Sequence, residues 1–137
     1  MNRFIVAGLL TLGLGSGAVL VQAQSSASGA YTAAQATTGK AQYSQNCAGC
    51  HGANLQGGAG PALKGSSFTA KWANGSKTVD DLYYIIHTQM PLNAPGSLKE
   101  SQYLAITAYI LQQNGYKAGK TALSSKNLKS IKLTKPM

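Results

Sequence analysis

The stretch Cys47-Ala48-Gly49-Cys50-His51 determines how the rest of this chain is interpreted. Two cysteines separated by two residues and followed at once by histidine form the attachment signature for haem c. The two thiols add across the vinyl groups of the porphyrin, and the histidine then lies under the macrocycle, where it binds iron. We therefore expect one covalent haem c, with Cys47 and Cys50 as its attachment sites and His51 as the proximal iron ligand.

Three other interpretations of the cysteine pair are weaker. A thioredoxin-type redox pair is disfavoured by the histidine that follows and by the lack of alternating strands and helices. A zinc site needs a second pair of ligands, but the whole chain has only two cysteines and two histidines. A disulfide across two intervening residues would close a tight, strained loop.

The N-terminus predicts export from the cytoplasm. Arg3 precedes an apolar run, and the small residues Val21 and Ala23 predict cleavage after Ala23, so that residues 1–23 form a signal peptide. The alternative is an uncleaved membrane anchor, which the glycines within the run disfavour. Because bacterial haem c is attached outside the inner membrane, we expect a periplasmic protein, in contact with the membrane only if the segment stays uncleaved.

The charge of the chain restricts its partners. Loss of Arg3 leaves 11 lysines against Asp80, Asp81 and Glu100, a formal charge of +8. A surface of this kind attracts nucleic acid, anionic lipid or an acidic protein. Nucleic acid is disfavoured because the chain has no nucleic-acid-binding motif and no arginine after residue 3. We therefore expect an acidic redox partner.

Composition and capping signals divide the rest of the chain. Residues 24–37 are rich in Ser, Ala and Thr and predict a flexible leader, with docking of Tyr31 on the domain as the alternative for that residue. We expect a domain over residues 38–115 and a lysine-rich extension over 116–137, within a mature chain of about 114 residues that begins at residue 24. The predicted helices run from Thr38 to Asn46, from Ser66 to Ala73, from Thr78 to His87, and from a capping box at Ser97–Glu100 to a stop at Gly115.

The glycine-rich stretch 52–65 predicts a loop that wraps the proximal side of the haem. A haem histidine usually donates its second ring N–H to a backbone carbonyl, and the Gly60-Pro61 region is placed to supply one. We expect Leu63 to pack against the porphyrin. Trp72 is either a core aromatic or a wall of the haem crevice whose N–H reaches a propionate.

Met90 is the expected distal iron ligand. It lies in a loop rich in proline and glycine, 39 residues beyond His51, and Pro91 stiffens the loop behind it. A thioether is soft and neutral and favours ferrous iron. His87 is the rival ligand, but it falls on the preceding predicted helix. The other alternative is that Met90 only fills a gap in the packing.

These motifs together resemble the class I cytochromes c. The resemblance covers residues 38–115, and Gly39 and Tyr43 lie where the first helix of that family crosses its last, at Thr107-Ala108-Tyr109-Ile110. It implies an all-α fold of four to five short helices around one covalent haem. It also implies an electron carrier rather than an enzyme, because His51 and Met90 would occupy both axial positions. The alternative is a haem enzyme or gas sensor whose sixth position is open.

A narrower resemblance concerns the partner. Short phrases such as Met90-Pro91, Pro95-Gly96-Ser97-Leu98 and Asn114-Gly115-Tyr116 are similar to cytochrome subunits that serve quinoprotein (PQQ-dependent) alcohol and sugar dehydrogenases. This implies a quinoprotein dehydrogenase as electron donor, and a terminal oxidase is the alternative partner. Several such subunits carry three haems, whereas this chain has one attachment motif. We expect lysines such as Lys64, Lys71 and Lys77 to steer the partner.

Overall fold

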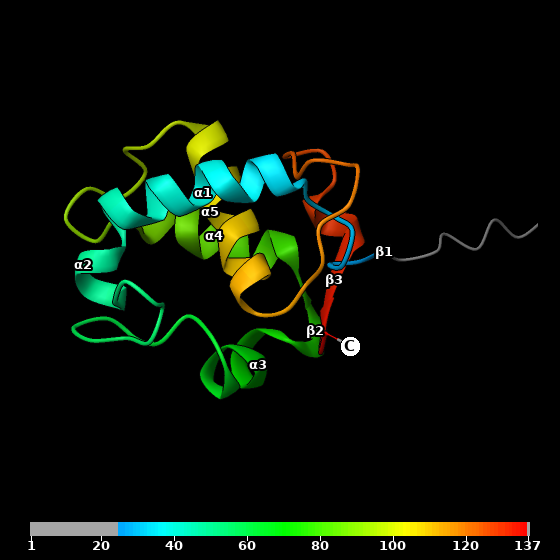
Figure 1. Ribbon diagram of the computed structural model, residues 1–137, viewed down its shortest axis with the longest axis horizontal. Helices are drawn as coiled ribbons and strands as arrows, with labels where there is room; N and C mark the ends of the chain where they lie inside the picture. The colour runs from blue at the N-terminus through cyan, green and yellow to red at the C-terminus, as the bar shows by residue number, and fades with distance from the viewer. Residues whose placement is uncertain (1–24, 137) are drawn as a thin grey trace, which may run out of the picture.

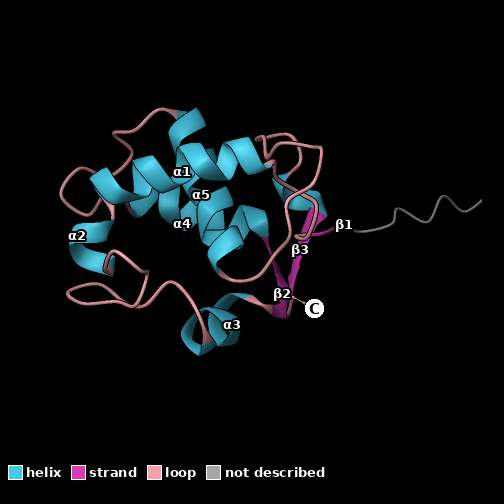
Figure 2. Cartoon of the chain, viewed as in Figure 1, coloured by secondary structure: helices cyan, strands magenta, loops and turns pink. Residues whose placement is uncertain are grey.

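The computed structural model describes residues 25–136, which form a helical domain with a small sheet at one end (Figures 1 and 2). The helices are α1 (Ala33–Asn46), α2 (Ala48–His51), α3 (Ser66–Trp72), α4 (Val79–Gln89) and α5 (Glu100–Gln113), with a 3-10 turn η1 (Leu128–Ser130). The strands are β1 (Ser25–Ser26), β2 (Asn74–Thr78) and β3 (Ile131–Thr134). None of the described helices has the length and hydropathy needed to cross a bilayer. The predicted signal peptide lies outside the described residues.

The crossing of α1 and α5 is the centre of the fold, as Figure 1 shows. A Cβ atom at Gly39 would lie 1.9 Å from the Ala105 carbonyl oxygen, so only glycine allows the two backbones to come this close. Beside it, the rings of Tyr43 and Tyr109 pack with their centroids 5.4 Å apart. The predicted contact between the first and last helices is therefore confirmed.

Helix α5 is the most buried element of the domain. Every residue from Tyr103 to Leu111 is buried, because other elements cover the helix on all sides along this stretch. Its start differs from the prediction: the N-cap is Lys99, whose amide donates to the Gln102 side chain at 2.9 Å. Ser97 and Glu100 therefore do not form the expected capping box, and Ser97 belongs to the preceding loop.

Helix α1 begins five residues earlier than predicted. Its N-cap is Thr32, whose hydroxyl accepts a hydrogen bond from the Gln35 amide at 3.2 Å. Tyr31 is buried, and its hydroxyl donates to the Tyr116 carbonyl. The Gln35 side chain also exchanges two 2.9 Å hydrogen bonds with the backbone of Leu123. The expectation of a flexible leader is therefore wrong for the described residues 25–37, because tertiary contacts order a segment of weak local preference.

A three-stranded sheet, in the order β1-β3-β2, joins the N-terminal and C-terminal segments of the described chain. β1 pairs in parallel with β3 through Ser25 and Ile131, and β2 pairs antiparallel with β3 through Thr78 and Lys132. Four apolar residues of the C-terminal tail are buried: Leu123, Leu128, and Ile131 and Leu133 within β3. The number of helices was predicted correctly, but the all-α prediction omitted this sheet, because strands of two to five residues carry little periodicity.

Helix α4 has the predicted start. The Thr78 hydroxyl accepts from the Asp81 amide, and the Asp81 carboxylate accepts from the Thr78 amide at 2.8 Å, which forms a capping box. This bond from the Thr78 backbone is the main cause of the lowered pKa of Asp81. The helix continues to Gln89, two residues beyond the predicted end, and Met90 caps it. The cap therefore fixes where the Met90 loop leaves the helix.

Candidate haem site

The attachment motif lies on a single helical turn at the end of α1. The Cys47 amide donates to the Tyr43 carbonyl at 2.8 Å, and the His51 amide donates to the Cys47 carbonyl at 3.0 Å. The chain therefore turns sharply from α1 into α2 and brings Cys47, Cys50 and His51 together. Both cysteines are free thiols, Cys47 half-buried and Cys50 exposed, while His51 is buried. Burial, reinforced by the neighbouring Cys50, raises the pKa of the Cys47 thiol to about 11.

The His51 ring is held in one orientation by the loop that follows it. Its Nδ1 lies 2.8 Å from the Pro61 carbonyl oxygen. Because a carbonyl oxygen only accepts, Nδ1 carries the proton and Nε2 keeps its lone pair for a metal. Gly60 lies directly against the ring, where a Cβ atom would be 2.8 Å from the His51 Cε1. The loop therefore selects both the tautomer and the position of this imidazole.

Hydrogen bonds from both sides attach the glycine-rich loop to the helices. The Tyr43 hydroxyl donates to the Gly52 carbonyl at 2.7 Å, and the side-chain amide of Asn114 donates to the Leu63 carbonyl at 2.9 Å. Within the loop, Gly60 N–H donates to the Cys50 carbonyl at 2.9 Å. Leu63 is half-buried, whereas Leu55 is fully buried and adopts a positive φ of 58°. Leu55 is therefore the side chain that anchors this loop in the core.

Met90 lies at the C-terminal end of α4 and is half-buried. The peptide bond between Met90 and Pro91 is cis. The Met90 carbonyl accepts a hydrogen bond of 2.7 Å from the Tyr103 hydroxyl on α5. His87 lies one turn back on α4, stacked on Tyr83 at 5.4 Å between ring centroids and edge-on to Tyr103 at 5.0 Å. The rival ligand is therefore part of an aromatic cluster.

Trp72 is buried at the end of α3, and the Lys71 ammonium lies 5.0 Å from its ring centroid. Figure 1 shows α3 on the far side of the 52–65 loop from α1, so Trp72 and the attachment motif come from different elements. This placement agrees with a core aromatic. Contact between its N–H and a propionate stays a prediction.

Two residues, Tyr103 and Asn114, hold the loops of the site through contacts that the sequence did not indicate. Tyr103 reaches the Met90 loop across 13 residues of chain, and Asn114 reaches Leu63 across 51. Neither role has a local signal, because each depends on a hydrogen bond that exists only after the helices have packed.

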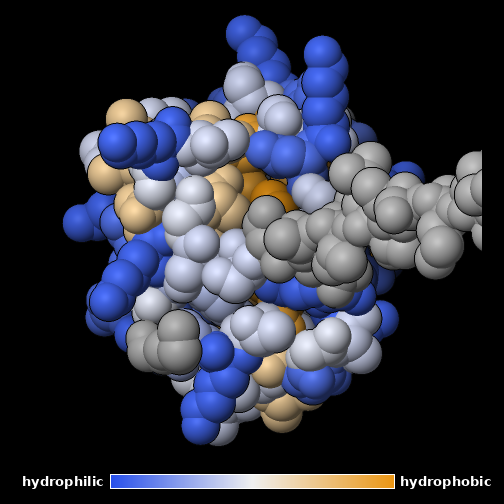
Figure 3. Space-filling view, turned by 90° about the vertical axis from the view of Figure 1, so that its right-hand side faces the viewer, coloured by the Kyte–Doolittle hydropathy of each residue, from blue (hydrophilic) through white to orange (hydrophobic). Residues whose placement is uncertain are grey.

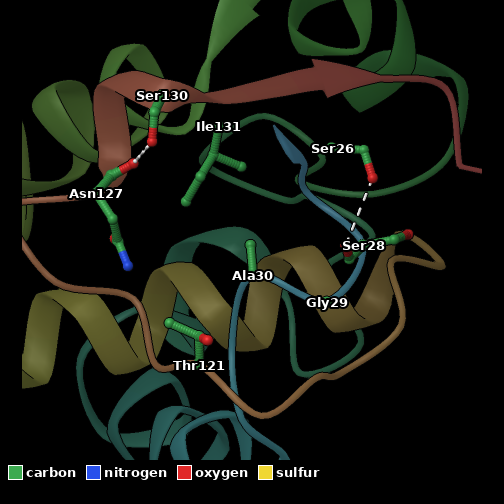
Figure 4. Close-up of a pocket in the computed structure, with 8 residues that line it drawn as sticks. All are labelled: Ser26, Ser28, Gly29, Ala30, Thr121, Asn127, Ser130 and Ile131. Atoms are coloured by element: carbon green, nitrogen blue, oxygen red, sulfur yellow. Dashed lines mark hydrogen bonds between the residues drawn. The ribbon is translucent and has the colours of Figure 1, made fainter. Parts of the chain in front are cut away.

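The structure also contains a cavity of about 420 Å³ near β1 and β3, at the opposite end of the molecule from α2 (Figures 1 and 4). Its lining carries no charged side chain and consists of Ser26, Ser28, Gly29, Ala30, Thr121, Asn127, Ser130 and Ile131. Two hydrogen bonds within this lining are visible in Figure 4, from Ser130 to Asn127 and from Ser26 to Ser28. The cavity is therefore separate from the attachment motif.

The described residues fit a covalently bound haem. They supply two cysteine thiols outside any disulfide, a buried imidazole whose Nε2 is available, and a Gly60 backbone so close to this ring that a Cβ atom would clash with it. Residues 25–136 contain no cluster of three or more His, Cys, Asp or Glu side chains that would favour another metal. The fold and the site together define a monohaem class I c-type cytochrome.

Comparison with known proteins agrees with this class. Residues 34–110 match the family described as cytochrome c oxidase, cbb3-type, subunit III, and the chain belongs to this family of haem-binding electron-transfer domains. No curated protein sequence matches the chain. A chain in the crystal structure of the sulfane dehydrogenase SoxCD from Paracoccus pantotrophus is 26% identical, with a TM-score of 0.58 over 90% of this chain and 68% of that one. The cofactor is thus haem c.

Proposed function

We propose that this protein is a periplasmic carrier of single electrons, with His51 and Met90 as the two axial iron ligands. The observation that carries the proposal is the 2.8 Å hydrogen bond between His51 Nδ1 and the Pro61 carbonyl, which leaves Nε2 free for iron. Bound haem supplies a one-electron couple, since its iron gains one electron from a reduced donor and returns it to an oxidised acceptor. Two permanent ligands would exclude substrate and oxygen, which favours a carrier over an enzyme.

Each part of the site has a separate task in this proposal. Cys47 and Cys50 hold the porphyrin covalently, and Pro61 orients the His51 ring. Met90 supplies the neutral thioether that favours the reduced state. Leu63 and Trp72 are proposed to border the porphyrin. Because the His51 ring and the loop around it are already fixed by hydrogen bonds, little has to rearrange when the electron arrives.

A variant at Met90 tests the distal ligand. Oxidised cytochromes with a methionine ligand show a weak charge-transfer band in the red, and we expect Met90→Ala to abolish it. His87→Ala is the matched control, because it removes the rival ligand three residues away and should leave the band in place. If Met90→Ala keeps the band, Met90 is not the ligand. A wild-type protein that lacks the band but has a low-spin ferric spectrum, lost in His87→Ala, would assign the ligand to His87. A wild-type protein that lacks the band and is high-spin would support an open position and a haem enzyme or sensor.

The proposed donor is a periplasmic dehydrogenase of acidic surface, and the proposed acceptor is a terminal oxidase. The family description names a cytochrome oxidase subunit and the similar crystal structure is titled a sulfane dehydrogenase, so both kinds of partner have support among the relatives. The quinoprotein dehydrogenase indicated by the sequence resemblance belongs to the same donor class. The chain is therefore either a free carrier or a subunit of such a complex.

Four of the lysines form two pairs in different parts of the structure. Lys64 and Lys71 lie on the 52–65 loop and α3, whereas Lys129 and Lys132 lie on η1 and β3 at the end opposite α2 (Figure 1). Long hydrophilic side chains project from this second end, the face that Figure 3 presents to the viewer. We propose that the first pair steers the partner, because it borders the loop around His51.

Stopped-flow reduction of the oxidised holoprotein tests the partner. A quinoprotein dehydrogenase with its substrate and a sulfane dehydrogenase with its substrate are compared across ionic strength. Fast reduction that slows steeply with salt would support the dehydrogenase donor. At low salt, Lys71→Glu should be reduced more slowly than wild type, whereas the control Lys129→Glu should be reduced at the wild-type rate. Slow reduction by both donors at every salt concentration would contradict this donor class without affecting the ligand assignment.

Export and cleavage need a separate test. N-terminal sequencing of the protein recovered from the periplasm should begin at Gln24. Recovery with Met1 intact in the membrane fraction would show an anchored protein instead.

A further inference from the structure

The hydroxyl of Tyr103 connects both ends of the loop that carries Met90. The side chain is fully buried on α5, and its hydroxyl donates to the Met90 carbonyl at 2.7 Å. The same oxygen accepts a hydrogen bond from the Leu98 amide at 3.2 Å. One phenol group therefore closes the loop 90–98 at its first and its last residue.

The remaining hydrogen bonds of this loop are internal, apart from the Met90 amide that ends α4. Ala94 N–H donates to the Pro91 carbonyl at 2.8 Å, and Ser97 N–H donates to the Ala94 carbonyl at 3.3 Å. The middle of the loop is exposed, with Leu92 78% accessible. Among the described residues, Tyr103 thus provides the hydrogen bonds by which another element holds the loop.

We propose that Tyr103 is a positioning residue that keeps the Met90 loop closed, and that this hydroxyl sets how readily a small neutral base such as imidazole replaces Met90 at iron. The inference deepens the proposed function and rests on Met90 being the distal ligand. The loop has internal bonds that survive opening, so it moves as one unit about its two ends. Loss of the Tyr103 hydroxyl leaves the Leu98 amide without its partner and shifts the equilibrium toward the open loop.

Tyr103→Phe removes the hydroxyl and keeps the ring that packs edge-on to His87. Tyr43→Phe is a matched control, because Tyr43 is equally buried and also donates a 2.7 Å hydrogen bond to a loop carbonyl, that of Gly52 on the proximal side. Imidazole is titrated into each ferric holoprotein and followed by its absorbance spectrum. We expect Tyr103→Phe to bind imidazole about 3- to 10-fold more tightly than wild type, from the typical net value of one hydrogen bond. Tyr43→Phe should stay within about twofold.

Thermal unfolding of the two variants separates positioning from general stability. Both should lose a similar amount of stability, because each loses one buried hydrogen bond, but only Tyr103→Phe should change imidazole affinity. Equal imidazole affinity in Tyr103→Phe and wild type, or an equal gain in both variants, would overturn the inference. Met90→Ala distinguishes this failure from failure of the proposed function, since it should bind imidazole more tightly than any other variant. If Met90→Ala binds imidazole only as wild type does, the ligand assignment is wrong.

A measurement on the wild-type protein covers the case in which Tyr103→Phe does not fold. At high imidazole concentration the replacement rate reaches the opening rate of the loop. At a pH where intrinsic amide exchange is faster than reclosing, the Leu98 amide should exchange its hydrogen at the same rate. Exchange of this amide only on global unfolding, together with faster replacement by imidazole, would contradict opening at Tyr103.

Discussion

The two sides of the haem site are built in different ways. The proximal segment 47–64 is hydrogen-bonded into helices α1 and α5 along its length, through Tyr43, Asn114 and its own backbone. The distal loop 90–98 is largely exposed and is held by a second element through the Tyr103 hydroxyl. The same fold therefore holds the His51 side through many hydrogen bonds and the side of the proposed ligand Met90 through few.

This difference follows from the chemistry that each ligand needs. His51 must keep its tautomer and position, and the bond to Pro61 together with the close contact of Gly60 fixes both. As the proposed distal ligand, Met90 would need only to lie near the iron, since a thioether on a flexible side chain has no tautomer to select. The hydrogen bonds are concentrated where orientation matters, and the proposed opening falls on the loop with few external bonds.

The largest expected effect comes from the helix crossing that supports both sides. Gly39→Ala places a Cβ atom 1.9 Å from the Ala105 carbonyl oxygen, so α1 and α5 must separate. We expect a loss of about 3 kcal/mol or more in the free energy of unfolding. Because α1 leads into Cys47 and α5 carries Tyr103, both sides should weaken together, as measured by urea unfolding of the holoprotein. The exposed neighbour Lys40→Ala is the control, and equal stability of both variants would refute the close crossing.

A pair of glycine variants distinguishes the proximal side from the distal one. Gly60→Ala brings a Cβ atom within 2.8 Å of the His51 ring, and we expect a loss of about 1–3 kcal/mol because the ring cannot move away from Pro61. Gly96→Ala has its nearest contact at 3.8 Å but a φ of +72°, so only backbone strain of about 1 kcal/mol is expected. Thermal unfolding measures both. A greater loss in Gly96→Ala would reverse the comparison.

The sequence predicted the parts of the site that are written in short motifs. Cys47, Cys50 and His51 belong to one pentapeptide, and the Thr78 capping box is complete within four residues. The crossing at Gly39 was accessible through resemblance to a family, and the carbonyl near Pro61 through the hydrogen bond that a haem histidine usually donates. In each case the information is local, or is carried over by a known pattern.

What the sequence did not predict depends on contacts between distant segments. Residues 25–32 look like an unstructured leader, yet β1 pairs with β3 and Tyr31 is buried against the tail. The roles of Tyr103 and Asn114 are likewise hydrogen bonds across the packed domain. Such contacts override weak local preferences. They leave no helical or strand periodicity in the sequence from which they can be predicted.

A smaller effect is expected from the bond between α5 and the proximal loop. Asn114→Ala removes the 2.9 Å donation to the Leu63 carbonyl and the 3.1 Å bond accepted from the Gly65 amide. We expect a loss of about 1–2 kcal/mol in unfolding free energy and unchanged imidazole affinity, because the distal loop is not touched. Asn93→Ala, an exposed variant in the distal loop, serves as the control. Tighter imidazole binding in Asn114→Ala would show that the two sides are coupled.

The smallest expected effect is a loss of stability at alkaline pH. It involves Tyr116, which lies outside both loops. Burial raises the pKa of Tyr116 from 10.0 to about 12, while its hydroxyl donates to the Thr134 carbonyl at 2.8 Å. The unfolded chain therefore loses this proton first, so the stabilisation is fully present below pH 10 and is lost as the pH rises toward 12.

The difference between wild type and Tyr116→Phe isolates this contribution. Urea unfolding at a series of pH values should show wild type more stable below pH 10, with the advantage shrinking above it, because phenylalanine has no proton to lose. Imidazole affinity at neutral pH should be the same in both proteins, since Tyr116 lies on neither loop. A constant difference in stability up to pH 12 would mean that the phenol is not shielded from water. A change in imidazole affinity would mean that the C-terminal segment, and not Tyr103 alone, influences the replacement of Met90.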